Sequence, residues 1–247
     1  MTDKAYGFIG LGNMGRHMAA NMAKKGTDLM VYDKAGTAER APAGAARANS
    51  AAEVASRVET VFLCLPDGDI VHSVIEELLG AAPRALKRVV DTSTIGIPAA
   101  ERGFETCQAM GIEYVDSPIS GGVAGARNAT LAVMFAGGAE TFEQLSPVYR
   151  QMAGNVFRVG GRAGQGQAMK LLNNFLSGTA MAATSEAIAF GIGQGLDMKT
   201  MLEVLNVSTG RNTATSDKFV NRVLTETYDA GFLAKLLYKD IRLYREA

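Results

Sequence analysis

The sequence contains few of the residues that bind metals through nitrogen or sulfur. Cys64 and Cys107 are its only cysteines, and His17 and His72 are its only histidines. These four residues do not have the spacing of a zinc or iron–sulfur ligand set. We therefore expect a functional site without a metal.

The sequence also lacks a basic stripe and an uninterrupted apolar segment. Its 25 Lys and Arg balance its 25 Asp and Glu, and no run of basic residues points to nucleic acid as a partner. The longest apolar region, residues 171–196, is interrupted by Asn173, Asn174, Glu186 and Gln194, which disfavours a membrane span. The expected partner is a small molecule.

Three further patterns are missing. Thr2, Asp3 and Lys4 at the start do not form a secretory leader or a transit peptide, so we expect a cytoplasmic protein. A hydrolase of the α/β type would need a GxSxG elbow, which the sequence does not contain. A kinase-like P-loop would need Ser or Thr after its lysine, whereas Lys170 is followed by Leu171.

What the sequence does contain, up to about Gly160, is an alternation of short β-rich runs and helical stretches. The expected strands cover residues 6–9, 29–32, 60–65, 89–91, 113–115, 131–135 and 156–159. The continuously apolar run 61–65 suits a central strand that is buried on both faces. The pattern predicts an α/β fold with a Rossmann-type, doubly wound, mostly parallel sheet.

Beyond the glycine-rich stretch 160–166 the β signal disappears, and the chain to Ala247 has a helical pattern. We therefore expect two domains, a sheet domain over residues 1–162 and an all-helical domain over residues 163–247. The helix expected over residues 167–194 is apolar on most sides, which is typical of burial in a bundle, between domains or between subunits. We expect a homodimer or homotetramer formed through this domain.

A glycine-rich turn links the first predicted strand to a helix expected over residues 14–25. The turn has the pattern GxGxxG and consists of Gly10, Leu11, Gly12, Asn13, Met14 and Gly15. The strand before it, the helix after it and an acid eighteen positions later are the context of a dinucleotide site. Such glycines allow a tight turn, close approach of the pyrophosphate and tight helix packing.

That acid is Asp33, at the end of the second predicted strand. A carboxylate there accepts hydrogen bonds from the ribose hydroxyls and repels a 2′-phosphate, which favours NAD over NADP. Lys34 and Arg40 lie close in the sequence and keep NADP as the alternative.

The rest of the cofactor should lie at the carboxyl ends of the next two strands. The turns there contain Leu65, Pro66 and Asp67 after the third strand, and Ser93 and Thr94 after the fourth. Hydroxyl residues after a strand also commonly cap the next helix, so both roles stay open.

Two later segments carry polar groups suited to chemistry. Ser120 offers a hydroxyl beside the backbone amides of Gly121 and Gly122, which suits a carboxylate or an ordinary turn. Lys170 precedes Asn173 and Asn174 at helical spacings of three and four residues, so the three share one face. A hydride transfer needs a group that exchanges a proton with the substrate hydroxyl, and lysine can do this if its pKa is lowered. The alternative is a solvated surface lysine.

The residues resemble those of the β-hydroxyacid dehydrogenases, the family that contains 3-hydroxyisobutyrate dehydrogenase and tartronate semialdehyde reductase. The resemblance runs essentially from end to end of the chain. Its four motifs, in order, are GFIGLGNMG at 7–15, DSPISGG at 116–122, GQGQAMKLLNN at 164–174 and KD at 239–240.

This resemblance implies hydride transfer between NAD and a small 3-hydroxy acid, or reduction of the matching semialdehyde. It makes Lys170 the general acid/base and lets Lys239 close over the cofactor, with Thr94 near the nicotinamide. The residues that it assigns to the substrate are Ser120, Gly121, Gly122, Asn173, Asn174, Arg211 and Asn212.

Three alternatives stay open. Asp33 is similar to the acid of NAD-using 3-hydroxyisobutyrate enzymes, whereas a tartronate semialdehyde reductase using NADP would carry an Asn-Arg-Thr run there. A non-catalytic dinucleotide-binding module of this family would lack the lysine. Family members usually continue through more helices after the KD motif, so we expect the helical domain to be incomplete.

Overall fold

The structure of the protein is a computed structural model that describes residues 5–247. The predicted absence of a leader at Thr2, Asp3 and Lys4 lies outside the described residues. The chain forms two compact units, of which the first ends at Lys170 and the second comprises Leu171–Glu246. The boundary predicted after residue 162 falls eight residues before this division and stays a prediction.

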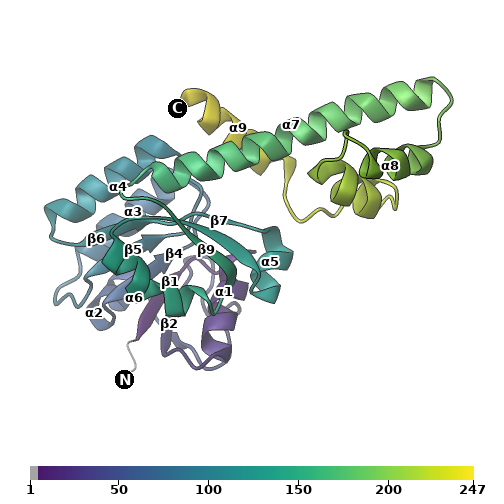
Figure 1. Cartoon of the computed structure of the whole chain (residues 1–247). Helices are drawn as coiled ribbons and strands as arrows, with labels where there is room; N and C mark the ends of the chain where they lie inside the picture. Colours follow the sequence, from purple (N-terminus) through teal and green to yellow (C-terminus); the bar gives the residue numbers. More distant parts are fainter. Residues whose placement is uncertain (1–4) are drawn as a thin grey trace. The chain divides into compact units, whose positions relative to one another are not determined.

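The first unit is built on a nine-stranded sheet with the order β3-β2-β1-β4-β5-β6-β8-β7, in which β9 pairs with β8 (Figure 1). All pairs from β3 to β6 are parallel, β8 runs antiparallel to β6 and β7, and β9 runs parallel to β8. The strands are β1 (Tyr6–Ile9), β2 (Leu29–Tyr32), β3 (Ala46–Arg47), β4 (Thr60–Leu63), β5 (Arg88–Asp91), β6 (Glu113–Asp116), β7 (Ile119–Ser120), β8 (Leu131–Ala136) and β9 (Ala153–Gly160). The predicted doubly wound, mostly parallel sheet is confirmed.

Helices cover both faces of this sheet. They are α1 (Gly15–Lys24), α2 (Ala51–Arg57), α3 (Gly68–Leu79), α4 (Ile97–Ala109), α5 (Gly122–Asn128) and α6 (Ala139–Tyr149). One apolar core joins α1, α5 and α6 to sheet residues such as Phe8 and Phe62, and the other joins α2, α3 and α4 to Val61 and Leu63. Because successive strand residues point to opposite faces, the run around β4 has to be apolar at every position.

The sequence prediction differs from the structure mainly at four strands, of which β9 begins at Ala153, three residues before its predicted start. β4 ends at Leu63, two residues before the predicted end, because the chain turns there and the Leu65 amide bonds to the Ser93 hydroxyl. β3 and β7 were not predicted, since each has only two residues and is too short to show a periodicity.

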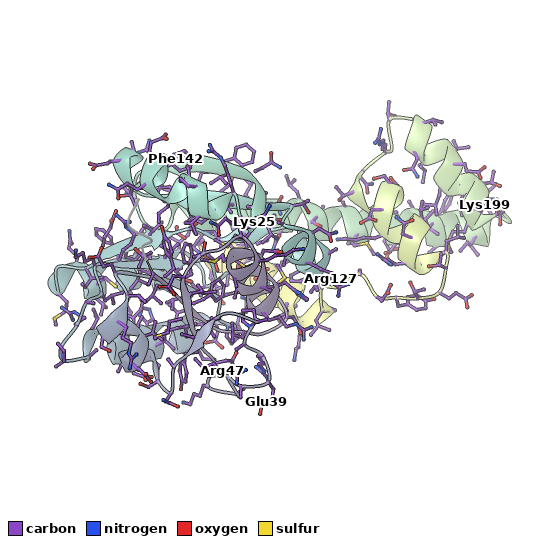
Figure 2. All side chains as sticks on the ribbon, turned by 90° about the horizontal axis from the view of Figure 1, so that it is seen from below. Lys25, Glu39, Arg47, Arg127, Phe142 and Lys199 are labelled. Carbon is purple, nitrogen blue, oxygen red and sulfur yellow. The ribbon has the colours of Figure 1, made fainter. Side chains whose placement is uncertain are left out.

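The second unit is helical, as predicted. Short connections separate its helices from one another. The long helix α7 (Gln165–Gly193) begins in the first unit and continues into the second, followed by α8 (Met198–Val207), the π-helix η1 (Ala214–Val223) and α9 (Ala234–Glu246). The small apolar core of the second unit contains Ile188, Leu202, Ala214 and Phe219. Lys199, labelled in Figure 2, marks α8.

Many large apolar side chains of the second unit are exposed. Leu176 and Phe190 on α7 are 61% and 71% exposed, and Val207 at the end of α8 is 88% exposed. By length and composition alone, α7 could also cross a membrane, a property that core helices of globular proteins share. These side chains remain exposed in the chain taken by itself.

Phe62 provides a test of the sheet core. Its ring is completely buried and packs against the rings of Phe8 and Tyr149. We expect Phe62→Ala to lower the free energy of unfolding by about 3–5 kcal/mol, because it leaves a cavity between the sheet and its helices. Phe157→Ala, at a ring that is 55% exposed, should lower it by less than about 1 kcal/mol. Urea unfolding measures both, and equal losses would contradict this account of the core.

Candidate active site

The glycine-rich turn lies between β1 and α1 and has the tight geometry that the pattern predicts. Gly10 has a φ of +95°, which disfavours any residue with a side chain. A Cβ atom on Gly15 would overlap the Gly10 carbonyl oxygen, so only glycine lets α1 begin this close to the turn. A Cβ atom on Gly12 would meet no atom within 4 Å, so this part of the turn is open. The turn therefore fits a pyrophosphate at the N-terminus of α1.

Asp33, directly after β2, is tied to this turn. Its Oδ2 accepts a hydrogen bond from the Leu11 amide at 2.6 Å, and its Oδ1 accepts one from the Ala35 amide at 2.8 Å. Arg40 places a guanidinium nitrogen 3.1 Å from the same Oδ1. Figure 2 labels Glu39 and Arg47 in the connection that carries Arg40. The Asp33 carboxylate and the Arg40 guanidinium thus form an ion pair where the adenosine ribose is expected.

The turns after β4 and β5 are joined by a side chain. The Leu65 amide donates to the Ser93 hydroxyl at 2.9 Å. Asp67 caps α3, since its carboxylate accepts a hydrogen bond from the Ile70 amide at 2.9 Å. The capping role left open for the hydroxyl residues is not seen for α4, which begins after Gly96 without a side-chain cap, and the Ser93 hydroxyl instead connects neighbouring turns. Pro66 and Thr94 lie beside them in these turns.

The Ser120–Gly122 segment connects β7 to α5. Gly121 and Gly122 have φ values of +130° and +62°, which glycine adopts without strain. The side chain of Ser120 is only half-buried. A compact glycine turn of this kind presents backbone amides beside a hydroxyl, as a carboxylate site requires.

Asp116, at the end of β6, is completely buried. Its Oδ2 accepts hydrogen bonds from the Gly164 and Gln167 amides at 2.9 and 3.1 Å, at the start of α7. Burial raises the pKa of Asp116 to about 6, although its hydrogen bonds from Gln167 act in the opposite direction. Sequence reasoning missed this contact because 48 residues separate Asp116 from Gly164.

Lys170 is the last residue of the first unit. Its side chain lies on α7 and is only 8% exposed, so it is not a solvated surface lysine. It is therefore in the same compact unit as the glycine turn, Asp33 and the Ser120–Gly122 segment.

The second unit brings three of its predicted site residues together. The Asn174 amide donates to Asp240 Oδ2 at 2.6 Å and its oxygen accepts from the Asn173 amide at 3.0 Å. Lys239 Nζ lies 3.3 Å from Asp240 Oδ1. Asp240 is buried and links these residues, a role that sequence reasoning did not assign to the acid of its KD motif.

Arg211 and Asn212 lie elsewhere in this unit. The Asn212 side-chain oxygen accepts hydrogen bonds from the Ala214 and Thr215 amides at 2.7 and 3.1 Å, and its nitrogen donates to Thr184. Thr184 is ten residues beyond Asn174 on α7, or about 15 Å along the helix axis. Asn212 therefore caps η1, and Arg211 beside it is exposed. A role for either residue in substrate binding stays a prediction.

Cysteine, histidine and acidic side chains form no cluster of three that could hold a metal ion within residues 5–247. Cys64 and Cys107 are free, and burial raises the pKa of each thiol to about 12. A thiolate ligand or nucleophile is thus disfavoured at both positions.

Two known protein families match the chain in consecutive segments. Residues 5–161 match the NAD binding domain of 6-phosphogluconate dehydrogenase. Residues 164–247 match the NAD-binding domain of NADP-dependent 3-hydroxyisobutyrate dehydrogenase. Together the two matches cover nearly all of the chain.

Named relatives are similar over nearly the whole chain. A 3-hydroxyisobutyrate dehydrogenase of Pseudomonas aeruginosa is 38% identical, over 98% of this chain and 84% of its own length. A 2-(hydroxymethyl)glutarate dehydrogenase of Eubacterium barkeri is 34% identical, over 98% of this chain and 81% of its own length. The structure of a 3-hydroxyisobutyrate dehydrogenase of Mycobacterium tuberculosis with L-serine is similar with a TM-score of 0.88 and 30% identity, over 98% of this chain and 86% of that one. With its dinucleotide turn, its buried lysine and these relatives, the chain belongs to the β-hydroxyacid dehydrogenase family.

Proposed function

We propose that this protein transfers a hydride between a small 3-hydroxy acid and NAD, with Lys170 as the general acid/base. The observation that carries the proposal is the burial of Lys170 in the same compact unit as the dinucleotide turn. A buried lysine is rare unless it interacts with other polar groups, because burial disfavours its charged form. The nicotinamide, when bound, accepts or returns the hydride.

Each predicted residue would have a distinct task in this reaction. Lys170 would take the hydroxyl proton of the substrate during oxidation and return it during reduction. Ser120 and the amides of Gly121 and Gly122 would bind the carboxylate. Asn174, whose amide is oriented by Asp240 at 2.6 Å, would hold the substrate hydroxyl together with Asn173.

The names of three relatives narrow the class of substrate. Besides the 3-hydroxyisobutyrate and 2-(hydroxymethyl)glutarate enzymes, an NAD-dependent L-serine dehydrogenase of Pseudomonas aeruginosa is 35% identical over 99% of this chain. All three named compounds carry a hydroxymethyl group on the carbon next to a carboxylate, and they differ in the third substituent of that carbon. We therefore propose a 2-substituted 3-hydroxypropanoate as the substrate.

We also propose that the protein acts in the cytoplasm without a nucleic acid or membrane partner.

Lys170→Ala tests the acid/base role. We expect kcat for the oxidation of 3-hydroxyisobutyrate or L-serine to fall by about 10²–10⁴-fold, because the hydroxyl proton loses its acceptor. The appearance of NADH absorbance measures the rate, and NADH fluorescence should show unchanged cofactor binding. Lys199→Ala, at an exposed lysine of α8, is the control. Nearly full turnover by Lys170→Ala would refute the mechanism, and inactivity of the unmodified protein on every 2-substituted 3-hydroxypropanoate would refute the substrate class.

The choice of cofactor depends on Asp33 and Arg40. Asp33 alone would repel a 2′-phosphate, whereas an arginine at this place can bind one. Arg40 contacts Asp33 at 3.1 Å and is partly exposed, so it offsets the negative charge and can turn toward a phosphate. We therefore propose that NAD is the main cofactor and that Arg40 supports a secondary use of NADP.

Arg40→Ala should separate the two cofactors. We expect kcat/KM with NADP to fall at least about tenfold, since a charge-assisted hydrogen bond is lost and the carboxylate of Asp33 is no longer neutralised. With NAD, kcat/KM should stay equal or rise. Arg47→Ala, in the exposed strand β3 of the same connection, should change neither value. An equal effect of Arg40→Ala on both cofactors would contradict the proposal.

We further propose that a second copy of this chain covers the exposed apolar side chains of the second unit. They occur on α7, α8 and the segment before α9, and include Leu176, Phe190, Val207 and Leu233. Several large apolar side chains exposed on one unit are the residues that a subunit interface commonly buries. The expected assembly is a homodimer or homotetramer.

Leu176→Asp tests this assembly. The side chain is 61% exposed in the isolated chain, so a carboxylate there should not disturb the fold. We expect this substitution to weaken the interface, because association would bury the new carboxylate without a partner. The mass measured by light scattering should therefore shift toward that of the monomer. Met110→Asp, at a side chain of the first unit that is 49% exposed, should leave the mass unchanged. A monomeric unmodified protein would contradict the proposal.

A further inference from the structure

Gln167 is a completely buried glutamine in the first turn of α7. Its Nε2 donates to Asp116 Oδ1 at 2.9 Å and to the Ser93 carbonyl at 3.0 Å. Its Oε1 accepts hydrogen bonds from the Ile95 and Gly96 amides at 2.9 and 3.2 Å. An amide side chain has two donor and two acceptor positions, so every one of them is used.

These four bonds join three segments of the first unit. The residues from Ser93 to Gly96 form the turn between β5 and α4, which is predicted to lie beside the nicotinamide. Asp116 ends β6 and begins the segment that leads to Ser120. Between 51 and 74 residues separate Gln167 from these partners.

Asp116 also holds the start of α7 through the backbone. The Gly164 and Gln167 amides, which donate to its Oδ2, are among the N-terminal amides that have no partner within the helix. A carboxylate at this end of a helix is favoured by the helix dipole. Asp116 therefore acts as an N-cap that comes from a distant part of the sequence.

Tight packing leaves the first turn of α7 little freedom. A Cβ atom on Gly166 would lie 2.8 Å from the Met134 carbonyl oxygen and from Pro118 Cδ, and 2.9 Å from Asp116 Cγ. The helix backbone thus lies directly against the sheet at this point. Lys170 follows Gln167 by three residues, so the position of Lys170 depends on how this turn is held.

We infer that Gln167 is a positioning residue, which through its bonds to Asp116 and the Ser93–Gly96 turn fixes Lys170 for proton transfer. The inference rests on the proposed role of Lys170 as acid/base. Proton transfer needs heavy atoms about 2.6–3.2 Å apart, and a misplacement of about 1 Å can lower a rate roughly 100-fold. A side chain that ties both the lysine-bearing turn and the nicotinamide-side turn to the sheet controls this distance.

Gln167→Met tests the inference in the full chain, because methionine fills a similar volume without hydrogen bonds. We expect kcat for 3-hydroxyisobutyrate or L-serine to fall about 30-fold or more, with NADH affinity within about threefold. The deuterium isotope effect on kcat, measured with substrate labelled at the reacting carbon, should rise because hydride and proton transfer become rate-limiting. A merely structural role would not change this isotope effect.

Gln165→Met is the matched control. Gln165 lies two residues earlier, in the same turn, and its Oε1 accepts hydrogen bonds from the Gly161 and Arg162 amides at 2.9 Å each. It is thus a hydrogen-bonded glutamine of the same chemistry that does not bond to Asp116 or to the Ser93–Gly96 turn. We expect Gln165→Met to lower the Tm without changing kcat or the isotope effect.

A pair of exchanged residues keeps the test decisive where Gln167→Met folds poorly. Gln167→Glu alone sets two carboxylates against each other, and Asp116→Asn alone removes an acceptor or sets two amide groups against each other. The double variant Asp116→Asn, Gln167→Glu restores the bond between residues 116 and 167, with the asparagine as donor and the glutamate as acceptor, while the bond to the Ser93 carbonyl stays lost. We expect it to recover at least about tenfold of the kcat lost by the worse single variant, and to lower the isotope effect again.

The outcomes separate this inference from the proposed function. Nearly full turnover by Lys170→Ala would overturn the acid/base role and the inference with it. An inactive Lys170→Ala together with an unchanged kcat and isotope effect in Gln167→Met would overturn the positioning role alone. A double variant that regains the Tm lost by the single variants but none of the lost kcat would also overturn it, because the restored bond between residues 116 and 167 would then not set the position of the lysine.

Discussion

The structure of the first unit depends on a buried carboxylate at the point where the sheet ends and the long helix begins. Asp116 has no exposure to solvent and accepts hydrogen bonds from two backbone amides and from Gln167. These bonds determine where α7 starts relative to β6, and therefore where the following turn with Lys170 lies. A charged group without water has to be fully hydrogen-bonded, so the start of α7 has little freedom to move elsewhere.

The parallel order of β1, β4, β5 and β6 explains why distant segments meet at this place. The carboxyl ends of parallel strands lie at one edge of a sheet, so the turns after these strands become neighbours. Ser93 lies in the middle of this series. Its hydroxyl accepts a hydrogen bond from the Leu65 amide, and its carbonyl accepts one from the Gln167 side chain. The topology brings the turns together, and a few side chains fix their relative positions.

The sequence was sufficient to predict what depends on local pattern. Seven of the nine strands, the GxGxxG turn and Asp33 follow from periodicity and from the conformations of glycine, and the structure confirms the fold that they predict. The bonds of Gln167 could not be predicted, because its partners are 51 or more residues away and a glutamine in a helix has many uses. The contact of Arg40 with Asp33 was only indicated by proximity in the sequence, since the intervening turn decides where the guanidinium points. The capping role of Asn212 had a local signal, an asparagine before a helix, which the family resemblance outweighed.

The pKa of Asp116 reflects two opposing effects, since burial raises it and the hydrogen bonds from Gln167 and Gly164 lower it. Burial raises this pKa to about 6 from an ordinary value of 3.8, so the folded protein holds the proton more tightly than the unfolded chain does. The contribution of Asp116 to the free energy of unfolding therefore falls as the pH rises from about 4 through 6, and above that range the ionised form opposes folding. At neutral pH an apolar side chain of similar shape would avoid this penalty, but it could not accept the amides of Gly164 and Gln167. At neutral pH the ionised carboxylate is thus less favourable than its protonated form would be, while its oxygens still accept the amides at the start of the helix that carries Lys170.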